Sequence, residues 1–157
     1  VYKRQIYYHE LKLNSSKYLK INKNLIPTGK FKNIKKSIYD FSNFKNIGKK
    51  LNYFKNKRLD TKFKGFDTTF GVKKNIRNYV GTLKNNNSNI KVDFFSNLPG
   101  VQLYSAQNLN YKKKLFPYQG ICLETQYFPD SPNKKNFPST LIEPNKSYTC
   151  FTKIKIN

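Results

Sequence analysis

The stretch GICLETQYFPDSPNKKNFPST, residues 120–140, combines a strand-like run with a segment rich in turn-forming residues. Successive side chains of an extended strand point to opposite faces. Ile121 and Leu123 therefore share one face of the strand. Glu124 and Gln126 share the other, and the PDSPN segment that follows favours a turn. The stretch predicts a β-strand with one apolar and one polar face, ended by a turn.

The same two-residue alternation recurs through the second half of the chain. Its apolar members are Ile90, Val92 and Phe94, then Val101 and Leu103, then Ile154 and Ile156. Turn-forming residues separate these runs at residues 85–89, 98–100, 129–133 and 143–147. Strands joined by such short connections favour antiparallel pairing in a sandwich or barrel. The sequence therefore predicts an all-β fold.

The first half of the chain is less regular. Residues 9–14, HELKLN, resemble a strand, and residues 26–30, IPTGK, predict a turn. In residues 42–54, four apolar side chains follow helical spacing, namely Phe44, Ile47, Leu51 and Phe54. One short helix is expected there, although Gly48 weakens it. No repeat or linker divides the chain, so one domain, or part of one, is expected.

The chain carries a formal net charge of +23, from 31 Lys and Arg residues against 8 Asp and Glu residues. Clustered positive charge favours polyanionic partners, because phosphate binding releases counterions. Here the lysines are scattered, and the longest run is residues 112–114. The abundant Lys, Asn, Ile, Phe and Tyr are also encoded by codons rich in A and T. We interpret the charge as a solvated basic surface, with a dedicated nucleic-acid face as the alternative.

Cysteine and histidine usage argues against a metal or disulfide framework. Cys122 and Cys150 are separated by 28 positions and lack metal-ligand spacing, so buried free thiols are expected. His9 is the only histidine. No apolar run approaches about 20 residues and no signal peptide is recognised, which predicts a cytoplasmic location. The start at Val1 and the absence of Met suggest a fragment.

Three polar residues stand out as candidates for chemistry. Glu124 lies in an apolar run, and a carboxylate in partly apolar surroundings is a better proton acceptor near neutral pH. Its alternative role is a structural ion pair with a lysine. Gln102 shares a strand face with Tyr104 and suits recognition of hydroxyl groups, unless both are merely surface residues of an edge strand. Asp67 either contacts a ligand or stabilises a turn after Gly65.

Several ordered motifs between about residue 8 and residue 157 resemble the C-terminal half of the galactose mutarotase, or aldose 1-epimerase, family. They are HELKLN, LIPTGKF, SIYDFSNFKNIGKKL, GFDTTF, LPGVQLYS and GICLETQYFPDSPNKKNFPSTLIEPNKSY. The last block is the most specific. The resemblance implies that residues 1–157 form a single partial domain, half of an antiparallel β-supersandwich with at most one or two short helices.

The resemblance also implies an activity, the interconversion of α and β anomers of aldohexoses such as galactose or glucose, with no cofactor. By this likeness, Glu124 removes the proton of the anomeric hydroxyl while a histidine protonates the ring oxygen. Asp67 and Gln102 are expected to form hydrogen bonds with the sugar. No metal and no membrane partner are implied.

Departures from the family pattern limit this expectation. The Asn-His-Ser-Tyr-Phe-Asn type motif that supplies the acid is absent, and His9 corresponds to a different histidine. Residues 1–5 do not match and are interpreted as a junction or artefact. Thr68 and Thr69 replace the usual His-Asn pair. The isolated chain is therefore expected to be inactive and poorly soluble, and a basic RNA-binding or ribosomal protein and a non-catalytic carbohydrate-binding module remain alternatives.

Overall fold

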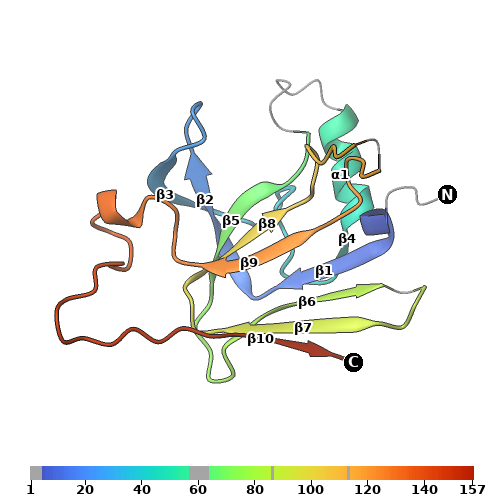
Figure 1. Cartoon of the computed structure of the whole chain (residues 1–157). Helices are drawn as coiled ribbons and strands as arrows, with labels where there is room; N and C mark the ends of the chain where they lie inside the picture. The colour runs from blue at the N-terminus through green and yellow to red at the C-terminus, as the bar shows by residue number, and fades with distance from the viewer. Residues whose placement is uncertain (1–4, 57–63, 86, 113) are drawn as a thin grey trace.

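Two five-stranded antiparallel sheets form the framework of the molecule (Figure 1). The computed structural model describes residues 5–56, 64–85, 87–112 and 114–157. The first sheet has the spatial order β10 (Thr152–Ile156), β7 (Lys91–Ser96), β6 (Tyr79–Asn85), β1 (His9–Leu13) and β4 (Lys45–Asn46). The second has the order β3 (Pro27–Asn33), β2 (Ser15–Ile21), β5 (Asp67–Val72), β8 (Gly100–Tyr104) and β9 (Cys122–Gln126). The predicted all-β sandwich architecture is confirmed.

Helical structure is limited among the described residues. It consists of α1 (Ile47–Asn56) and two short 3-10 turns, η1 (Gln5–Tyr8) and η2 (Ser131–Asn133). Residues 1–4, part of the stretch interpreted as a junction, lie outside the described residues. That interpretation stays a prediction.

The core joins both sheets, because apolar side chains alternate along their strands. A single cluster contains Leu11 and Leu13 of β1, Phe70 of β5, and Val101 and Leu103 of β8. All five are at most 1% exposed. Burial of apolar area at about 25 cal/mol per Å² is the main favourable contribution to such packing. The alternation that the sequence shows in β8 thus fixes which of its faces is polar.

Helix α1 follows the spacing predicted from the sequence. Ile47 and Leu51 are fully buried against the core, whereas Phe44 precedes the helix and is partly exposed. The side-chain oxygen of Asn46 accepts a hydrogen bond of 2.8 Å from the Lys49 amide, which caps the helix start. Gly48 has a packing role, because a Cβ atom there would lie 2.5 Å from the Tyr7 carbonyl oxygen. The close contact between α1 and η1 therefore requires the glycine.

The prediction of a turn at residues 26–30 was wrong. Pro27–Asn33 form β3, which pairs with β2, and the chain reverses just before it at residues 22–26. Asn22 closes this reversal by accepting a 3.0 Å hydrogen bond from the Ile26 amide through its side chain. Gly29 adopts a φ of 79° inside β3, a left-handed conformation that favours glycine.

The apolar face of the first sheet becomes more exposed to solvent from β1 toward β10. Leu11, Leu83, Val92 and Ile156 are successive partners across β1, β6, β7 and β10. Leu11 is fully buried, Leu83 and Val92 are half-buried, and Ile156 is 72% exposed. Every residue from 138 to 157 is exposed. In Figure 1 this terminal segment leaves β9, swings away from the sandwich and returns as β10.

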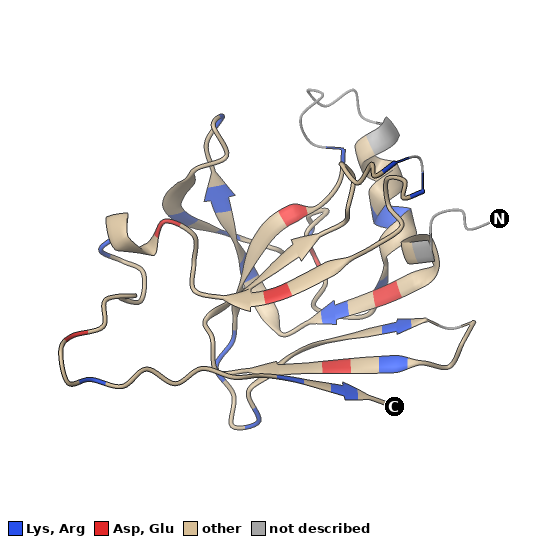
Figure 2. Cartoon of the chain, in the orientation of Figure 1, with Lys and Arg blue, Asp and Glu red and all other residues tan. Residues whose placement is uncertain are grey.

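Charged residues are spread over the fold. Figure 2 shows Lys and Arg on strands of both sheets and on several connecting segments. The acidic residues on the strands include Asp67 on β5 and Glu124 on β9. Among the described residues, no helix is long and apolar enough to cross a membrane.

Candidate active site

Three adjacent strands of the second sheet bring the predicted site residues together. Gln102 of β8 lies directly opposite Thr69 of β5 on one side and Glu124 of β9 on the other. Asp67 is two residues from Thr69, so its side chain lies on the same face. Residues far apart in the sequence thus converge because neighbouring antiparallel strands align their side chains in rows.

The side-chain amide of Gln102 is held from two directions. Its Nε2 group donates a hydrogen bond of 2.6 Å to Oδ1 of Asp67. Thr69 donates a 2.5 Å hydrogen bond from its hydroxyl to Oε1 of Gln102. An ionised carboxylate only accepts, so the amide nitrogen must face Asp67 and the amide oxygen must face Thr69. Thr69, only 5% exposed, therefore fixes the orientation of Gln102.

The structure does not show the alternative roles considered for Asp67, a turn-stabilising residue, and for Gln102, a surface residue of an edge strand. Asp67 begins β5, and its carboxylate contacts Gln102 of the neighbouring strand instead of closing a turn after Gly65. Strand β8, which carries Gln102, lies between β5 and β9 and is not an edge strand. Both residues belong to a cross-strand polar network, which is a suitable arrangement for contacting hydroxyl groups.

Glu124 lies on β9, the last strand of its sheet, and its side chain is exposed. The partly apolar surroundings expected from the sequence are therefore absent from this carboxylate. Glu124 forms no ion pair with any described residue, so the alternative of a structural ion pair with a lysine is not observed there. The carboxylate is open to solvent and available to a ligand.

A large cavity of about 740 Å³ connects these residues. Asp67, Gln102 and Glu124 all line it, together with Thr69 and Gln126. The volume is within the range of about 300–1,000 Å³ typical of small-molecule sites. The predicted residues therefore share one concave surface.

The cavity exists because β2 and β5 diverge. Their pairing extends from Ser15 opposite Val72 to Tyr18 opposite Phe70. Beyond Tyr18, residues 19–21 of β2 leave β5, and a register irregularity in the β2 and β3 pairing lies at the same position. The β2 and β3 hairpin supplies one wall of the cavity, while β5, β8 and β9 supply the other.

Aromatic residues on the hairpin side were missed by the sequence analysis. Tyr18 and Tyr39 both line the cavity, and their ring centroids are 4.2 Å apart. Burial raises the pKa of the Tyr39 phenol, and the neighbouring Tyr18 raises it further, while the hydrogen bond with Thr68 lowers it. The phenol therefore stays protonated near neutral pH and can donate a hydrogen bond. The sequence did contain a signal for Tyr39, because the SIYDF motif is part of the family resemblance. No role was assigned to this tyrosine.

The cysteines differ from expectation in their burial. Cys122 and Cys150 are free thiols, as expected, but Cys122 is half-buried and Cys150 is exposed. Burial raises the pKa of the Cys122 thiol, and the nearby charge of Glu124 adds to the effect. Cys122 is thus neutral near pH 7 and is a poor nucleophile. Among the described residues, no group of three His, Cys, Asp or Glu side chains could hold a metal ion.

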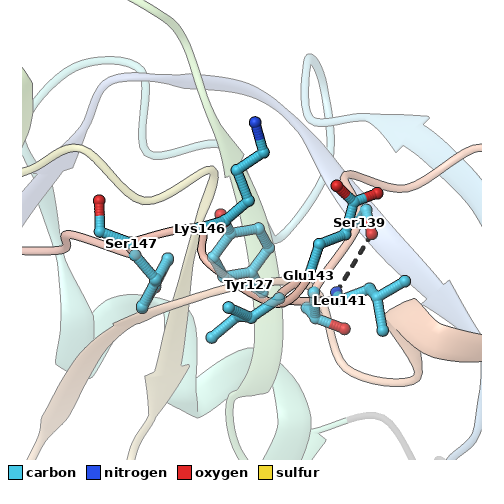
Figure 3. Close-up of a pocket in the computed structure, with 9 residues that line it drawn as sticks. Tyr127, Ser139, Leu141, Glu143, Lys146 and Ser147 are labelled. Carbon is cyan, nitrogen blue, oxygen red and sulfur yellow. Dashed lines mark hydrogen bonds between the residues drawn. The ribbon is translucent and has the colours of Figure 1, made fainter.

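A second cavity, of about 560 Å³, lies on the connection between β9 and β10 (Figure 3). Tyr127 lies at its centre in this view, with Leu141 and Glu143 on one side and Ser147 on the other. The rings of Tyr127 and Tyr148 are 6.0 Å apart. Apart from Tyr127, the residues that line this cavity belong to the exposed segment 138–157, and none of the three predicted site residues lines it.

The fold and the row of polar residues agree with the family match of the chain. The chain belongs to the aldose 1-epimerase family, whose sequence model matches residues 2–155. Among its relatives, galactose mutarotase of Mus musculus is 29% identical over 159 residues, which covers 97% of this chain and 44% of the mouse protein. Galactose mutarotase of Homo sapiens is 28% identical over 157 residues, covering 95% of this chain and 44% of the human protein. The chain spans less than half the length of these relatives.

Solved structures show the same fold. An aldose epimerase homologue from C. elegans superposes with a TM-score of 0.78 at 19% identity, covering 95% of this chain and 45% of that one. Galactose 1-epimerase from Lactobacillus acidophilus gives a TM-score of 0.70 at 20% identity, covering 97% of this chain and 44% of that one. The sequence comparisons and the structural comparisons thus agree that this chain spans less than half the length of the proteins it matches.

Proposed function

We propose that this chain is the C-terminal half of an aldose 1-epimerase that interconverts the α and β anomers of aldohexoses such as galactose or glucose. The observation that supports this function is the alignment of Asp67, Gln102 and Glu124 on one cavity of a family member. A sugar presents hydroxyl groups that both donate and accept hydrogen bonds. A carboxylate, an amide and a phenol on one surface complement such a ligand.

In the proposed reaction, Glu124 accepts the proton of the anomeric hydroxyl. The electrons of that O–H bond form the carbonyl at C1, and the bond between C1 and the ring oxygen breaks. An acid must deliver a proton to the ring oxygen at the same stage. Rotation about the C1–C2 bond and closure on the other face, with both proton transfers reversed, give the opposite anomer. Proton transfer by a positioned group contributes about 10²- to 10⁴-fold to a rate.

Glu124 can reach a ligand as the proposed base, because it lines the cavity and forms no ion pair with the described residues. Asp67 and Gln102 are proposed to orient the sugar, with Thr69 as the positioning residue for Gln102. His9, the only histidine in the sequence, lies on β1 of the first sheet and does not line the cavity. The acid is therefore proposed to come from the part of the family domain outside this chain.

The test replaces Glu124 in a full-length enzyme that contains this chain. Polarimetry of freshly dissolved α-D-galactose should show that Glu124→Gln slows mutarotation by about 10²- to 10⁴-fold. Glu143→Gln is the matched control, because it removes an exposed carboxylate that lines the other cavity. Undiminished mutarotation by the Glu124→Gln enzyme would refute the role of Glu124.

The isolated chain gives a second test of the same proposal. Because the chain supplies a base and sugar contacts without a histidine on the cavity, it is proposed to lack measurable turnover by itself. The 157-residue chain is mixed with α-D-galactose, and its polarimetric rate is compared with the uncatalysed rate. Catalysis by the isolated chain would show that an acid from elsewhere is unnecessary.

A further inference from the structure

Gln107 is a buried polar residue that has no role in the reaction described above. It follows β8 and lines the same cavity as the three predicted site residues. Only 8% of Gln107 is exposed. A buried side-chain amide is normally paired, because burying its donors and its acceptor without partners costs free energy. The hydrogen bonds of this amide therefore indicate whether Gln107 is only structural.

The oxygen end of the amide is bound within the protein. The Ser105 hydroxyl donates a 2.8 Å hydrogen bond to Oε1 of Gln107 and accepts a 2.8 Å hydrogen bond from the Phe66 amide. A serine hydroxyl has one proton, and its other acceptor, the Phe66 carbonyl oxygen, lies farther away at 3.4 Å. Gly65 leaves room for this contact, because a Cβ atom there would lie 2.8 Å from Oε1. The amide oxygen is thereby fixed toward Ser105.

The nitrogen end of the amide faces away from Ser105 and is open to a ligand. Nε2 forms no hydrogen bond with any residue in the described ranges 5–56, 64–85, 87–112 and 114–157. It is also not among the fully buried unpaired side-chain atoms of those ranges, so it still reaches solvent. Because Gln107 is buried and lines the cavity, Nε2 reaches solvent through the cavity. Two N–H donors are thus directed at whatever occupies the cavity.

Tyr104 adds a donor at the same end of the cavity. Its hydroxyl accepts a 3.3 Å hydrogen bond from the Asn108 backbone amide, which leaves the phenolic proton available to a ligand. Tyr104 lines the cavity and lies opposite Asp67 in the pairing of β8 with β5. Oδ1 of Asp67 accepts from Gln102, so Oδ2 can accept from a ligand. Donors from Gln107 and Tyr104 beside a carboxylate acceptor complement sugar hydroxyl groups.

Gln107 lies at the end of the cavity that is remote from Glu124. Gln102 and Glu124 form one row across the sheet, and Asp67 lies in the next row, about 7 Å away. Gly65, which lies beside Gln107, is two residues farther in the same direction. Since Glu124 is the proposed base, C1 of the sugar lies near that first row. The ring then extends past Asp67, and its far side lies nearest to Gln107.

We propose that Gln107 is a sugar-contacting residue that selects the substrate, and that its Nε2 group donates a hydrogen bond to the oxygen on C4 or C6 of the aldohexose. The inference rests on the proposed function, because that function places C1 beside Glu124. A sugar that lacks this oxygen would leave the buried amide unpaired and is therefore discriminated against. A purely structural Gln107 would not discriminate among such sugars.

The test compares two substitutions in a full-length enzyme that contains this chain. Gln107→Glu keeps an oxygen for Ser105 but removes the N–H donors, whereas Gln107→Met removes both in an unbranched side chain. Binding of D-galactose is measured by ligand-observed NMR titration, so it does not depend on turnover. Both variants should weaken binding about three- to tenfold, the contribution of one hydrogen bond. If Gln107 only holds Ser105, Gln107→Glu should bind D-galactose like the native enzyme.

The matched control is Asn110→Asp. It also replaces an amide by a carboxylate on the connection after β8, but at an exposed residue that lines neither cavity. We expect it to bind D-galactose like the native enzyme. Gln107→Met carries the comparison if the buried carboxylate of Gln107→Glu prevents folding, which urea denaturation of each variant checks.

Deoxygenated sugars identify the contacted oxygen. The native enzyme and the Gln107 variants are titrated with 2-deoxy-, 4-deoxy- and 6-deoxy-D-galactose. The weakening caused by the substitution should persist with the 2-deoxy sugar and disappear with the 4-deoxy or the 6-deoxy sugar, in which the partner of Nε2 is already missing. In mutarotation assays, Gln107→Glu should raise KM with little change in kcat, because the contact lies far from the reacting atoms.

Three results would overturn the proposal. One is binding of D-galactose by Gln107→Glu within about twofold of the native enzyme. Another is equal weakening with D-galactose and all three deoxy sugars, which would assign a structural role to Gln107. The third is the absence of saturable binding of D-galactose by the native enzyme. All three are binding results, whereas the role of Glu124 fails on the rate of mutarotation, so the two failures are distinguishable.

Discussion

Replacing Thr69 by valine tests whether this residue holds the side chain of Gln102 in place. Valine has nearly the same shape and is also β-branched, so the strand preference of the position is retained. The substitution removes the hydroxyl that donates to Oε1 of Gln102 at 2.5 Å. The hydrogen bond from Nε2 of Gln102 to Asp67 is left in place.

The expected loss of stability follows from the burial of this contact. A hydrogen bond of this kind contributes about 0.5–1.5 kcal/mol net, and an acceptor left buried and unsatisfied costs about 1–3 kcal/mol. Thr69 is 5% exposed and Gln102 is half-buried, so water can partly replace the lost donor. We expect Thr69→Val to lower the free energy of unfolding by about 1 kcal/mol. With an m-value of about 2 kcal/mol/M, the urea midpoint falls by about 0.5 M.

The assay is urea denaturation followed by circular dichroism at low micromolar protein, because the exposed Ile154 and Ile156 of β10 favour association at higher concentration. A double-mutant cycle combines Thr69→Val with Gln102→Met, and the coupling energy should be about 1 kcal/mol. Thr69→Ser retains the hydroxyl and should keep most of the coupling. A coupling energy below about 0.3 kcal/mol would mean that Thr69 does not hold Gln102 and would refute the reasoning.

Three further changes probe the framework. Burial alone would raise the pKa of Asp93, but hydrogen bonds from Thr82, Lys91 and Asn157 outweigh it and lower this pKa. Asp93 therefore stabilises the fold above its usual pKa of 3.8. This contribution is lost as the pH falls through the lowered pKa of the folded state. Urea midpoints of the native chain and Asp93→Asn should therefore differ at pH 6 and converge in acid; a constant difference would contradict this. Gly81→Ala should cost about 1–3 kcal/mol by thermal unfolding, because its Cβ would lie 2.6 Å from the Lys12 carbonyl oxygen. Leu51→Ala should cost about 2–5 kcal/mol in urea, because Leu51 is fully buried, and a loss below about 1 kcal/mol would show that α1 is not packed as described.

The second half of the sandwich could be predicted from its sequence because its strands are regular. In β8, Val101 and Leu103 alternate with Gln102 and Tyr104, and the structure buries the first pair and places the second on the cavity. In β9 the same alternation placed the side chains of Leu123 and Glu124 on different faces of the strand. Local periodicity was therefore sufficient to choose the polar faces, and the family resemblance supplied which strands belong together.

Strands β3 and β6 were harder to predict because each contains a local feature that interrupts the pattern. Strand β3 begins at Pro27 and includes Gly29 with a positive φ, both typical of turns. Strand β6 has Gly81 at a point where the backbone of β1 approaches closely. In these strands, contacts with neighbouring strands override the local residue preferences.

Exposure of the site could not be predicted, because it depends on which elements cover an edge. The apolar run around Glu124 suggested partial burial, yet β9 is the last strand of its sheet and Glu124 is exposed. The wall formed by Tyr18 and Tyr39 was also missed, because it arises where β2 leaves β5. Such divergence is a property of the sheet as a whole and leaves no periodic signal.

Because β2 diverges from β5, the two walls of the cavity are formed by different parts of the sheet. The hairpin of β2 and β3 joins the rest of its sheet through the short ladder from Ser15 to Tyr18. Changes in its length or tilt can resize the hollow while β8 and β9 keep Gln102 opposite Glu124. Natural variants that alter this hairpin are therefore expected to change which ligands the cavity admits, while the pairing of β8 with β9 keeps the proposed base in the same place.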